Sequence, residues 1–157
     1  MSDIDFIIRQ ATEEDILQIV YLLADDQLGA IREQAENPLP DFYMNAFSQM
    51  QQQMGNEQYV VESDGKVIGC MQLTKIAGLS RKGMSRLQIE AVRIDKSIRS
   101  SGLGRKMMEF AIEHAKTTNC ELVQLTTDLT RQDAHRFYEN LGFKASHVGM
   151  KLDLSKD

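Results

Sequence analysis

The feature that most constrains the fold is a two-residue turn, Asp64-Gly65, between two short β-rich runs. Tyr59-Val60-Val61 precedes the turn, and Val67-Ile68-Gly69-Cys70-Met71 follows it. Asp-Gly favours a tight hairpin, because both central residues of that turn need a positive φ. The sequence therefore predicts an antiparallel strand pair near the middle of the chain, and a sheet that is not purely parallel.

Strand and helix patterns alternate around this hairpin. Alternating or β-rich runs predict strands at residues 6–9, 87–94 and 122–127, a return that starts at Phe143, and a last strand at residues 150–152. Apolar residues at helical spacing predict a helix capped by Thr12 and stopped by Gly29, and further helices at residues 42–54, 103–115 and 134–141. We expect an α/β (α+β mixed) fold, with a mixed, mostly antiparallel central sheet of six to seven strands flanked by about four helices.

Length and composition further limit the kind of protein that this sequence can encode. The 157 residues contain no repeat or linker, so we expect a single domain, 1–157. The formal net charge of -5 argues against a nucleic-acid partner. The acidic start and the absence of an apolar run of ~18–20 residues argue against secretion and against a membrane partner. Cys70 and Cys120 lack metal or redox spacing, and we expect buried free thiols in a reducing cytoplasm.

A glycine-containing segment follows the strand predicted at 87–94. It reads Arg99-Ser100-Ser101-Gly102-Leu103-Gly104-Arg105 and opens the helix predicted at 103–115. Backbone N–H groups at a helix N-terminus bind phosphate, glycine permits close approach, and arginine pairs with a diphosphate. The segment therefore favours a diphosphate-bearing cofactor; the alternative is a glycine-containing loop with an exposed basic rim. It matches neither the Walker loop nor the dinucleotide fingerprint.

Two motifs resemble those of the GNAT superfamily of N-acetyltransferases. Arg99, Gly102 and Gly104 match the acetyl-CoA signature Gln/Arg-x-x-Gly-x-Gly/Ala, and Tyr138 to Phe143 match a later Tyr-x-x-x-Gly-Phe. The pattern departs from the common family form at Lys96 and Arg131, where proline and asparagine are frequent. The resemblance implies a GNAT-like fold and direct transfer of an acetyl group from acetyl-CoA to an amine, through a ternary complex.

The resemblance also implies roles for particular residues. Tyr138 would protonate the departing CoA thiolate, although its ring also suits the core. Glu90 is our candidate general base; a water relay is an alternative, and so is an ordinary exposed charge on that strand. The residues expected to bind the cofactor, the first three through their backbone, are Val92, Arg93, Ile94, Arg99, Ser100, Ser101, Gly102, Leu103, Gly104 and Arg105.

The sequence leaves the acceptor open. We expect a small-molecule or peptide amine as the acceptor and no metal, and both a monomer and a homodimer are compatible with the sequence. The alternative function is a non-catalytic acetyl-CoA-sensing module of the same fold. Several acids near the second predicted helix suggest a cationic acceptor or, equally, a solvated acidic face: Asp25, Asp26, Glu33, Glu36 and Asp41. The three histidines, His114, His135 and His147, have no metal-ligand spacing.

Overall fold

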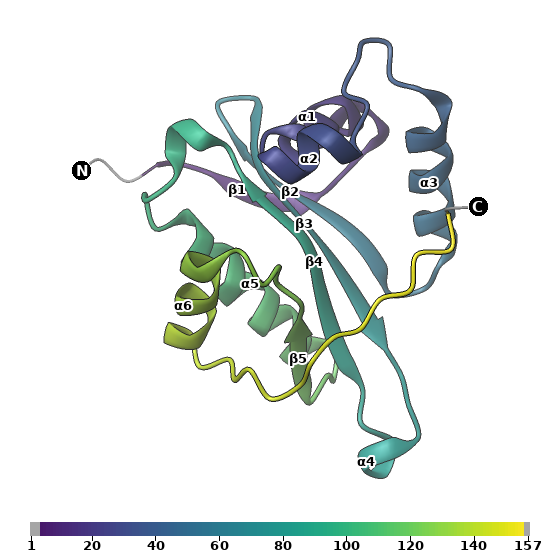
Figure 1. Ribbon diagram of the computed structural model, residues 1–157, viewed down its shortest axis with the longest axis vertical. Coiled ribbons are helices and arrows are strands. Elements are labelled where there is room, and N and C mark those ends of the chain that lie inside the picture. Colours follow the sequence, from purple (N-terminus) through teal and green to yellow (C-terminus); the bar gives the residue numbers. More distant parts are fainter. Residues whose placement is uncertain (1–3, 156–157) are drawn as a thin grey trace. The chain divides into compact units, whose positions relative to one another are not determined.

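A computed structural model describes residues 4–155 and contains a five-stranded sheet (Figure 1). The strands follow one another across the sheet in chain order: β1 (Ile7–Gln10), β2 (Asn56–Ser63), β3 (Lys66–Ile76), β4 (Arg86–Ile94) and β5 (Leu122–Leu125). The β1–β2, β2–β3 and β3–β4 ladders are antiparallel. The predicted hairpin is confirmed, with Ser63 opposite Lys66 and positive φ at Asp64 and Gly65.

Helices occupy most of the segments that carry a helical apolar stripe. They are α1 (Ile16–Ala24), α2 (Gln27–Arg32), α3 (Asp41–Gln52), the short α4 (Ser80–Gly83), α5 (Leu103–Thr117) and α6 (Gln132–Asn140), with 3-10 turns η1 (Glu13–Asp15) and η2 (Lys96–Ile98). The helices predicted at 42–54, 103–115 and 134–141 are confirmed. No helix in residues 4–155 is long and apolar enough to cross a membrane.

The predicted sheet of six to seven strands is wrong for the described chain, which has five. The missing strands are those expected after Phe143 and at 150–152, where the structure places no strand. A period-two pattern selects which side chains share a face, but a strand also needs a neighbouring strand for its hydrogen bonds. The alternation at 150–152 is therefore not sufficient for a strand, and the structure assigns none there.

Gly29 was predicted to stop the first helix, and this prediction is wrong. That helix already ends at Ala24, Asp26 caps α2, and Gly29 is buried inside α2. A Cβ at Gly29 would lie 1.8 Å from the carbonyl oxygen of Leu23. The glycine is therefore needed where α2 packs closely against the end of α1. Because α2 is a separate helix, the predicted number of about four helices was too low.

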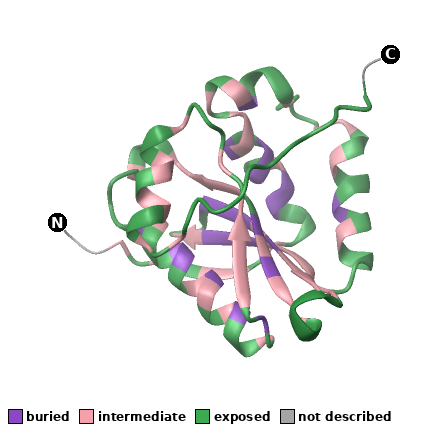
Figure 2. Cartoon of the chain, turned by 60° about the horizontal axis from the view of Figure 1, so that its bottom comes forward, coloured by how far each residue is buried: buried purple, intermediate pink, exposed green. Residues whose placement is uncertain are grey.

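Helices pack on both faces of the sheet, as predicted. On one face, Val60 and Cys70 join the core cluster formed with the apolar residues of α1. On the other face, the Tyr59 ring lies 5.2 Å from the Phe110 ring of α5, and a Cβ at Gly69 would lie 3.4 Å from the sulfur of Met107. Figure 2 shows that the buried residues lie mostly in strands and helices rather than in connecting loops. The alternation of β2 and β3 thus supplies two separate apolar layers.

The described chain divides between Gln124 and Leu125 into two compact units. The first unit contains β1 to β4, α1 to α5 and most of β5. The second contains α6 and the segment that follows it. The single-domain organisation stays a prediction.

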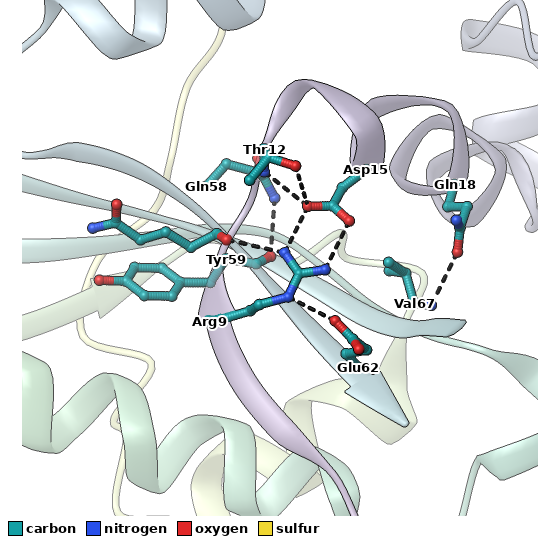
Figure 3. Close-up of polar contacts among 9 residues, drawn as sticks. Arg9, Thr12, Asp15, Gln18, Gln58, Tyr59, Glu62 and Val67 are labelled. Atoms are coloured by element: carbon teal, nitrogen blue, oxygen red, sulfur yellow. Dashed lines mark hydrogen bonds and ion pairs between the residues drawn. The ribbon is translucent and has the colours of Figure 1, made fainter. Parts of the chain in front are cut away.

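One ion pair, between the buried Asp15 carboxylate and the partly exposed Arg9 guanidinium, joins β1 to the start of α1 (Figure 3). Asp15 is 5% exposed and is the one buried charged residue in the described chain. Its carboxylate accepts two hydrogen bonds from the Arg9 guanidinium, at 2.7 and 2.9 Å, and a third from the backbone N–H of Thr12 at 2.7 Å. Arg9 also donates to Glu62 of β2. These bonds, led by the one from Arg9, hold the pKa of Asp15 below its ordinary value.

Candidate functional site

The segment from Arg99 to Arg105, which we call the 99–105 loop, follows β4 and η2 and runs into the first residues of α5. Asp95 caps η2 by accepting a hydrogen bond from the Ser97 N–H at 2.8 Å, and Arg99 donates from Nε to the Ile94 carbonyl at 3.3 Å. Ser100 and Gly102 are left-handed, with φ of 69° and 85°. These local bonds turn the chain sharply between the end of β4 and the first turn of α5.

Gly102 is the N-cap of α5 and faces open space. A Cβ built at Gly102 meets no atom within 4 Å, so the space beside this residue is open. The first N–H groups of a helix have no partner within the helix and carry the positive end of its dipole. The predicted opening of a helix at Gly102 is confirmed, and its first turn holds no acidic residue. This geometry suits an anionic group.

Arg99 and Arg105 of the 99–105 loop carry the positive charge that attracts a diphosphate. Arg99 is exposed. Arg105 is 62% exposed, and its Nε lies 3.4 Å from Glu109 one turn along α5. Such an exposed ion pair contributes little to stability, so Arg105 can leave it for a phosphate at small cost.

A bulge interrupts β4 just before the loop. Cys70 pairs with Arg93 and Gln72 pairs with Glu90, so Ala91 and Val92 together stand opposite Met71. Ala91 takes a left-handed φ of 51°. Bulges leave backbone groups outside the regular ladder and re-aim the chain. The bulge falls at the start of the stretch, Val92 to Ile94, whose backbone was expected to hold the acetyl and pantetheine ends.

The Arg93 side chain ties this bulge to the turn between α1 and α2. Its Nε lies 3.7 Å from Asp26 Oδ2, and one terminal nitrogen donates to the Val92 carbonyl at 2.9 Å. Asp26 also accepts from the Gly29 N–H as the cap of α2. The Arg93 side chain is thus engaged within the protein, and a contact between the Arg93 backbone and a cofactor stays a prediction.

Glu90 lies on the face of the sheet that carries Val60 and Cys70, because it stands opposite Gln72, two residues along β3 from Cys70. Its side chain is exposed, and no hydrogen bond or ion pair among residues 4–155 involves its carboxylate. Its neighbours on this face form amide pairs: Gln124 donates to Gln88 at 2.6 Å, and Gln72 donates to Asn56 at 2.9 Å. Glu90 is thus a lone carboxylate in a row of half-buried amides, which we call the amide row: Asn56, Gln72, Gln88 and Gln124.

Tyr138 belongs to the second unit and is half-buried there. Its ring packs edge-on against Phe137 and Phe143, at centroid distances of 5.2 and 5.9 Å. Its carbonyl accepts from the N–H of Phe143 at 3.1 Å across the left-handed Gly142. The Tyr-x-x-x-Gly-Phe motif therefore forms a compact helix end. A role for Tyr138 towards a cofactor stays a prediction.

The remaining candidates are structural. Cys70 and Cys120 are buried free thiols, as predicted, and burial raises the pKa of Cys70 to about 12. Within residues 4–155, no three His, Cys, Asp or Glu side chains lie close enough together to hold a metal ion.

Several site features were missed by sequence reasoning. Nothing in the sequence marks alanine at position 91 as left-handed, and the Asp26–Arg93 contact joins residues far apart in the chain. A signal for the amide row did exist. Gln88 and Glu90 share one side of an alternating strand, which places them together on one face of the sheet.

A bulged strand that leads into a glycine-opened helix defines a domain suited to an anionic cofactor. Residues 18–143 match the model of the acetyltransferase (GNAT) family, and the chain therefore belongs to this family. The predicted resemblance is confirmed.

Solved structures agree on the fold. The chain is 45% identical, with a TM-score of 0.92, to a crystal structure of a transcriptional regulator from Bacillus halodurans, covering 96% of this chain and 100% of that one. It is 27% identical, with a TM-score of 0.77, to an acetyltransferase from Trypanosoma brucei, over 96% and 100% of the two chains.

Two curated relatives are N-acetyltransferases. An aminoalkylphosphonate N-acetyltransferase from Salmonella typhimurium is 35% identical over 60 residues, which are 38% of this chain and 39% of the relative. A glucosamine 6-phosphate N-acetyltransferase from Trypanosoma brucei brucei is 32% identical over 90 residues, which are 57% and 59% of the two chains. The matched part of the chain thus spans 39% to 59% of the length of these relatives.

Proposed function

We propose that this chain is an N-acetyltransferase that moves the acetyl group of acetyl-CoA directly to an amine within a ternary complex. The observation that carries the proposal is the glycine-capped N-terminus of α5, with open space beside Gly102, a short segment after the β4 bulge. The N-terminus of α5 supplies N–H groups and positive charge for a diphosphate, and the β4 bulge supplies backbone groups for the acetyl-bearing arm of the cofactor. Membership of the GNAT family supports the same assignment.

Within this proposal, the described residues have separate tasks. The backbone of the 99–105 loop binds the diphosphate, with Arg99 and Arg105 as charge partners. The backbone of Val92 to Ile94 orients the acetyl group, and an N–H there stabilises the developing negative charge on its oxygen. The protein acts in the reducing cytoplasm, with neither a nucleic acid nor a membrane as partner.

Glu90 is proposed as the general base. An amine with a pKa of ~10.4 is almost fully protonated at pH 7, so a nearby proton acceptor accelerates attack. The Glu90 carboxylate is exposed, and no other described residue pairs with it, so it is available to take a proton directly or through water.

Glu90→Gln is expected to lower kcat by roughly 10²-fold or more at neutral pH, without weakening acetyl-CoA binding. Steady-state rates from pH 6 to 9 measure this effect, with the exposed Glu14→Gln as a matched control. Unchanged kcat and an unchanged pH profile in Glu90→Gln would remove Glu90 from the mechanism.

Tyr138 is proposed to protonate the CoA thiolate as it leaves. Tyr138→Phe keeps the ring that packs on Phe137 and Phe143, so it isolates the hydroxyl. We expect CoA release to slow by ~10²-fold or more, with acetyl-CoA affinity within about twofold of wild type. A thiol-reactive dye measures the release, and a wild-type rate would reject the role.

The acceptor is proposed to be a small or peptide amine that meets the amide row beside Glu90. Half-buried amides donate and accept hydrogen bonds, so they suit a polar acceptor. The relatives are named for aminoalkylphosphonate and glucosamine 6-phosphate, both small amines. The net charge of -5 favours a cationic amine for long-range attraction. A panel of polyamines, aminosugars, aminoalkylphosphonates and lysine peptides separates these classes.

The second candidate function is an acetyl-CoA-sensing module without catalysis. It is favoured by the 45% identity to a structure described as a transcriptional regulator. A sensor would bind acetyl-CoA, would release no CoA with any amine of the panel, and would be indifferent to Glu90→Gln and Tyr138→Phe.

A further inference from the structure

Two acids at the turn between α1 and α2 contact the chain that leads from β4 to α5. Asp26 Oδ2 lies 3.7 Å from Arg93 Nε. Asp25 Oδ1 lies 3.4 Å from Lys96 Nζ. Arg93 belongs to β4, Lys96 begins η2, and all four residues lie in the first compact unit. These two contacts, which we call the double ion pair, hold one turn to two successive elements of the chain.

The contact between Asp26 and Arg93 is the more buried of the two. Their side chains are 24% and 20% exposed, against 73% for Lys96. Arg93 Nε is itself buried and makes no hydrogen bond within residues 4–155. Because a guanidinium keeps its charge, a buried guanidinium nitrogen is costly without a nearby anion. Asp26 supplies that anion, so we expect this contact to matter more than the exposed one.

The Arg93 side chain also reaches the bulge in β4. One terminal nitrogen donates to the Val92 carbonyl at 2.9 Å. The preceding Ala91 has a left-handed φ of 51°, which is unfavourable for a residue with a Cβ and persists only where neighbouring contacts hold it. The same guanidinium thus joins the strained bulge to the α1–α2 turn.

The turn, the bulge and Glu90 share one face of the sheet. Arg93 stands opposite Cys70, which packs in the core with α1. Glu90 lies on this same face, on the other side of the bulge. Figure 1 shows α1 and α2 together over the sheet. The double ion pair therefore acts on the face that carries the proposed general base.

We propose that Asp26 and Arg93 are positioning residues, which fix the bulge so that its backbone meets the acetyl-bearing arm of acetyl-CoA. The second ion pair holds the same turn from η2. This inference rests on the proposed function, which assigns that arm to the backbone of residues 92–94. Neither ion pair includes a residue of the 99–105 loop. The double ion pair should therefore affect the binding of the arm and not that of the diphosphate.

Asp26→Asn tests the proposal with two ligands. Asparagine caps a helix as well as aspartate does, so α2 keeps its cap at Gly29 while Arg93 loses the opposite charge. We expect the affinity for acetyl-CoA to fall by roughly 5-fold. The affinity for 3′-phospho-ADP, which is CoA without its arm, should stay within about twofold of wild type. Calorimetric titration measures both, and a merely structural role would weaken both ligands or neither.

Long-range electrostatics predicts the opposite sign. Asp26→Asn removes a negative charge, so charge attraction alone would strengthen the binding of both anionic ligands. A loss confined to acetyl-CoA therefore reports the position of the bulge. Asp64→Asn makes the same change at an exposed hairpin residue whose left-handed φ asparagine tolerates, and it should leave both affinities unchanged.

Hydrogen exchange tests the contact without any ligand. The N–H groups of Gly29 and Ala30 bond to Asp26, so their exchange rates report on the turn. Arg93→Gln should raise these rates at least ~3-fold. Lys116→Gln, which breaks an exposed ion pair within α5, should not.

The outcomes separate this inference from the proposed function. If the wild type binds both ligands and Asp26→Asn keeps its acetyl-CoA affinity, or loses both ligands equally, the inference is overturned and the proposed function stands. Unchanged exchange in Arg93→Gln overturns it as well. A wild type that binds neither ligand would contradict the proposed function, and this inference with it.

Discussion

Gly102→Glu is expected to weaken acetyl-CoA binding by at least ~100-fold while the protein stays folded. The new side chain would enter the open space in front of α5, where a Cβ at Gly102 meets no protein atom within 4 Å. Its carboxylate would occupy the positive end of the helix and repel the diphosphate. Calorimetric titration with acetyl-CoA and with CoA measures the loss.

The hairpin offers a matched control for this variant. Gly65 is also left-handed, at φ 73°, and a Cβ there likewise meets nothing within 4 Å. Gly65→Glu thus introduces the same charge and a similar backbone strain, of roughly 1–2 kcal/mol, away from the 99–105 loop. Both variants should lose similar stability, and only Gly102→Glu should lose binding. Wild-type affinity in Gly102→Glu would place the cofactor elsewhere.

Asp15→Ala is expected to lower the free energy of unfolding by about 3 kcal/mol. Asp15 is buried, and its removal leaves the Arg9 guanidinium and the Thr12 N–H without the acceptor that they share. Arg9 is one-third exposed and keeps its bond to Glu62, so the cost comes chiefly from the charge-assisted hydrogen bonds that the buried carboxylate accepts. Urea denaturation measures the change.

Glu62→Gln is the control for Asp15→Ala, because the same Arg9 donates to both carboxylates and Glu62 is more exposed. It should cost less than ~1 kcal/mol. Equal losses in the two variants would contradict the assignment of the Arg9–Asp15 pair as the stabilising one.

The pH dependence of stability gives an independent check on Asp15. Its pKa in the folded protein lies below the ordinary value, so the unfolded chain binds the proton more tightly. The stabilisation is therefore present above pH ~4 and is lost as the pH falls below that value. Asp15→Asn should lose this part of the acid dependence. An acid limb identical to wild type would show that Asp15 does not contribute to it.

Elements with local signals were predictable from the sequence. The hairpin is set by Asp64-Gly65, and α3, α5 and α6 by apolar stripes at helical spacing. The 99–105 loop was predictable because its glycines and the start of α5 lie within seven consecutive residues. Membership of the GNAT family followed from two such local motifs.

The features that sequence reasoning missed depend on packing between distant segments. Gly29 looked like a helix stop, but it is required by the close approach of Leu23. The bulge at Ala91 arises because β4 has one residue more than β3 across that stretch. The strand predicted at 150–152 has the right alternation, yet the structure assigns no strand there. An alternating pattern predicts which residues share a face of a strand, but it does not predict which strand pairs with it.

The most direct test of the central claim is an amide NMR titration of the ¹⁵N-labelled protein with CoA. We expect the largest chemical-shift changes on the backbone amides of residues 92–94 and 99–105, and we expect CoA at 100 times Kd to raise the free energy of unfolding by ~2.7 kcal/mol. Saturable binding with the largest changes outside both segments, or no binding at all, would contradict it.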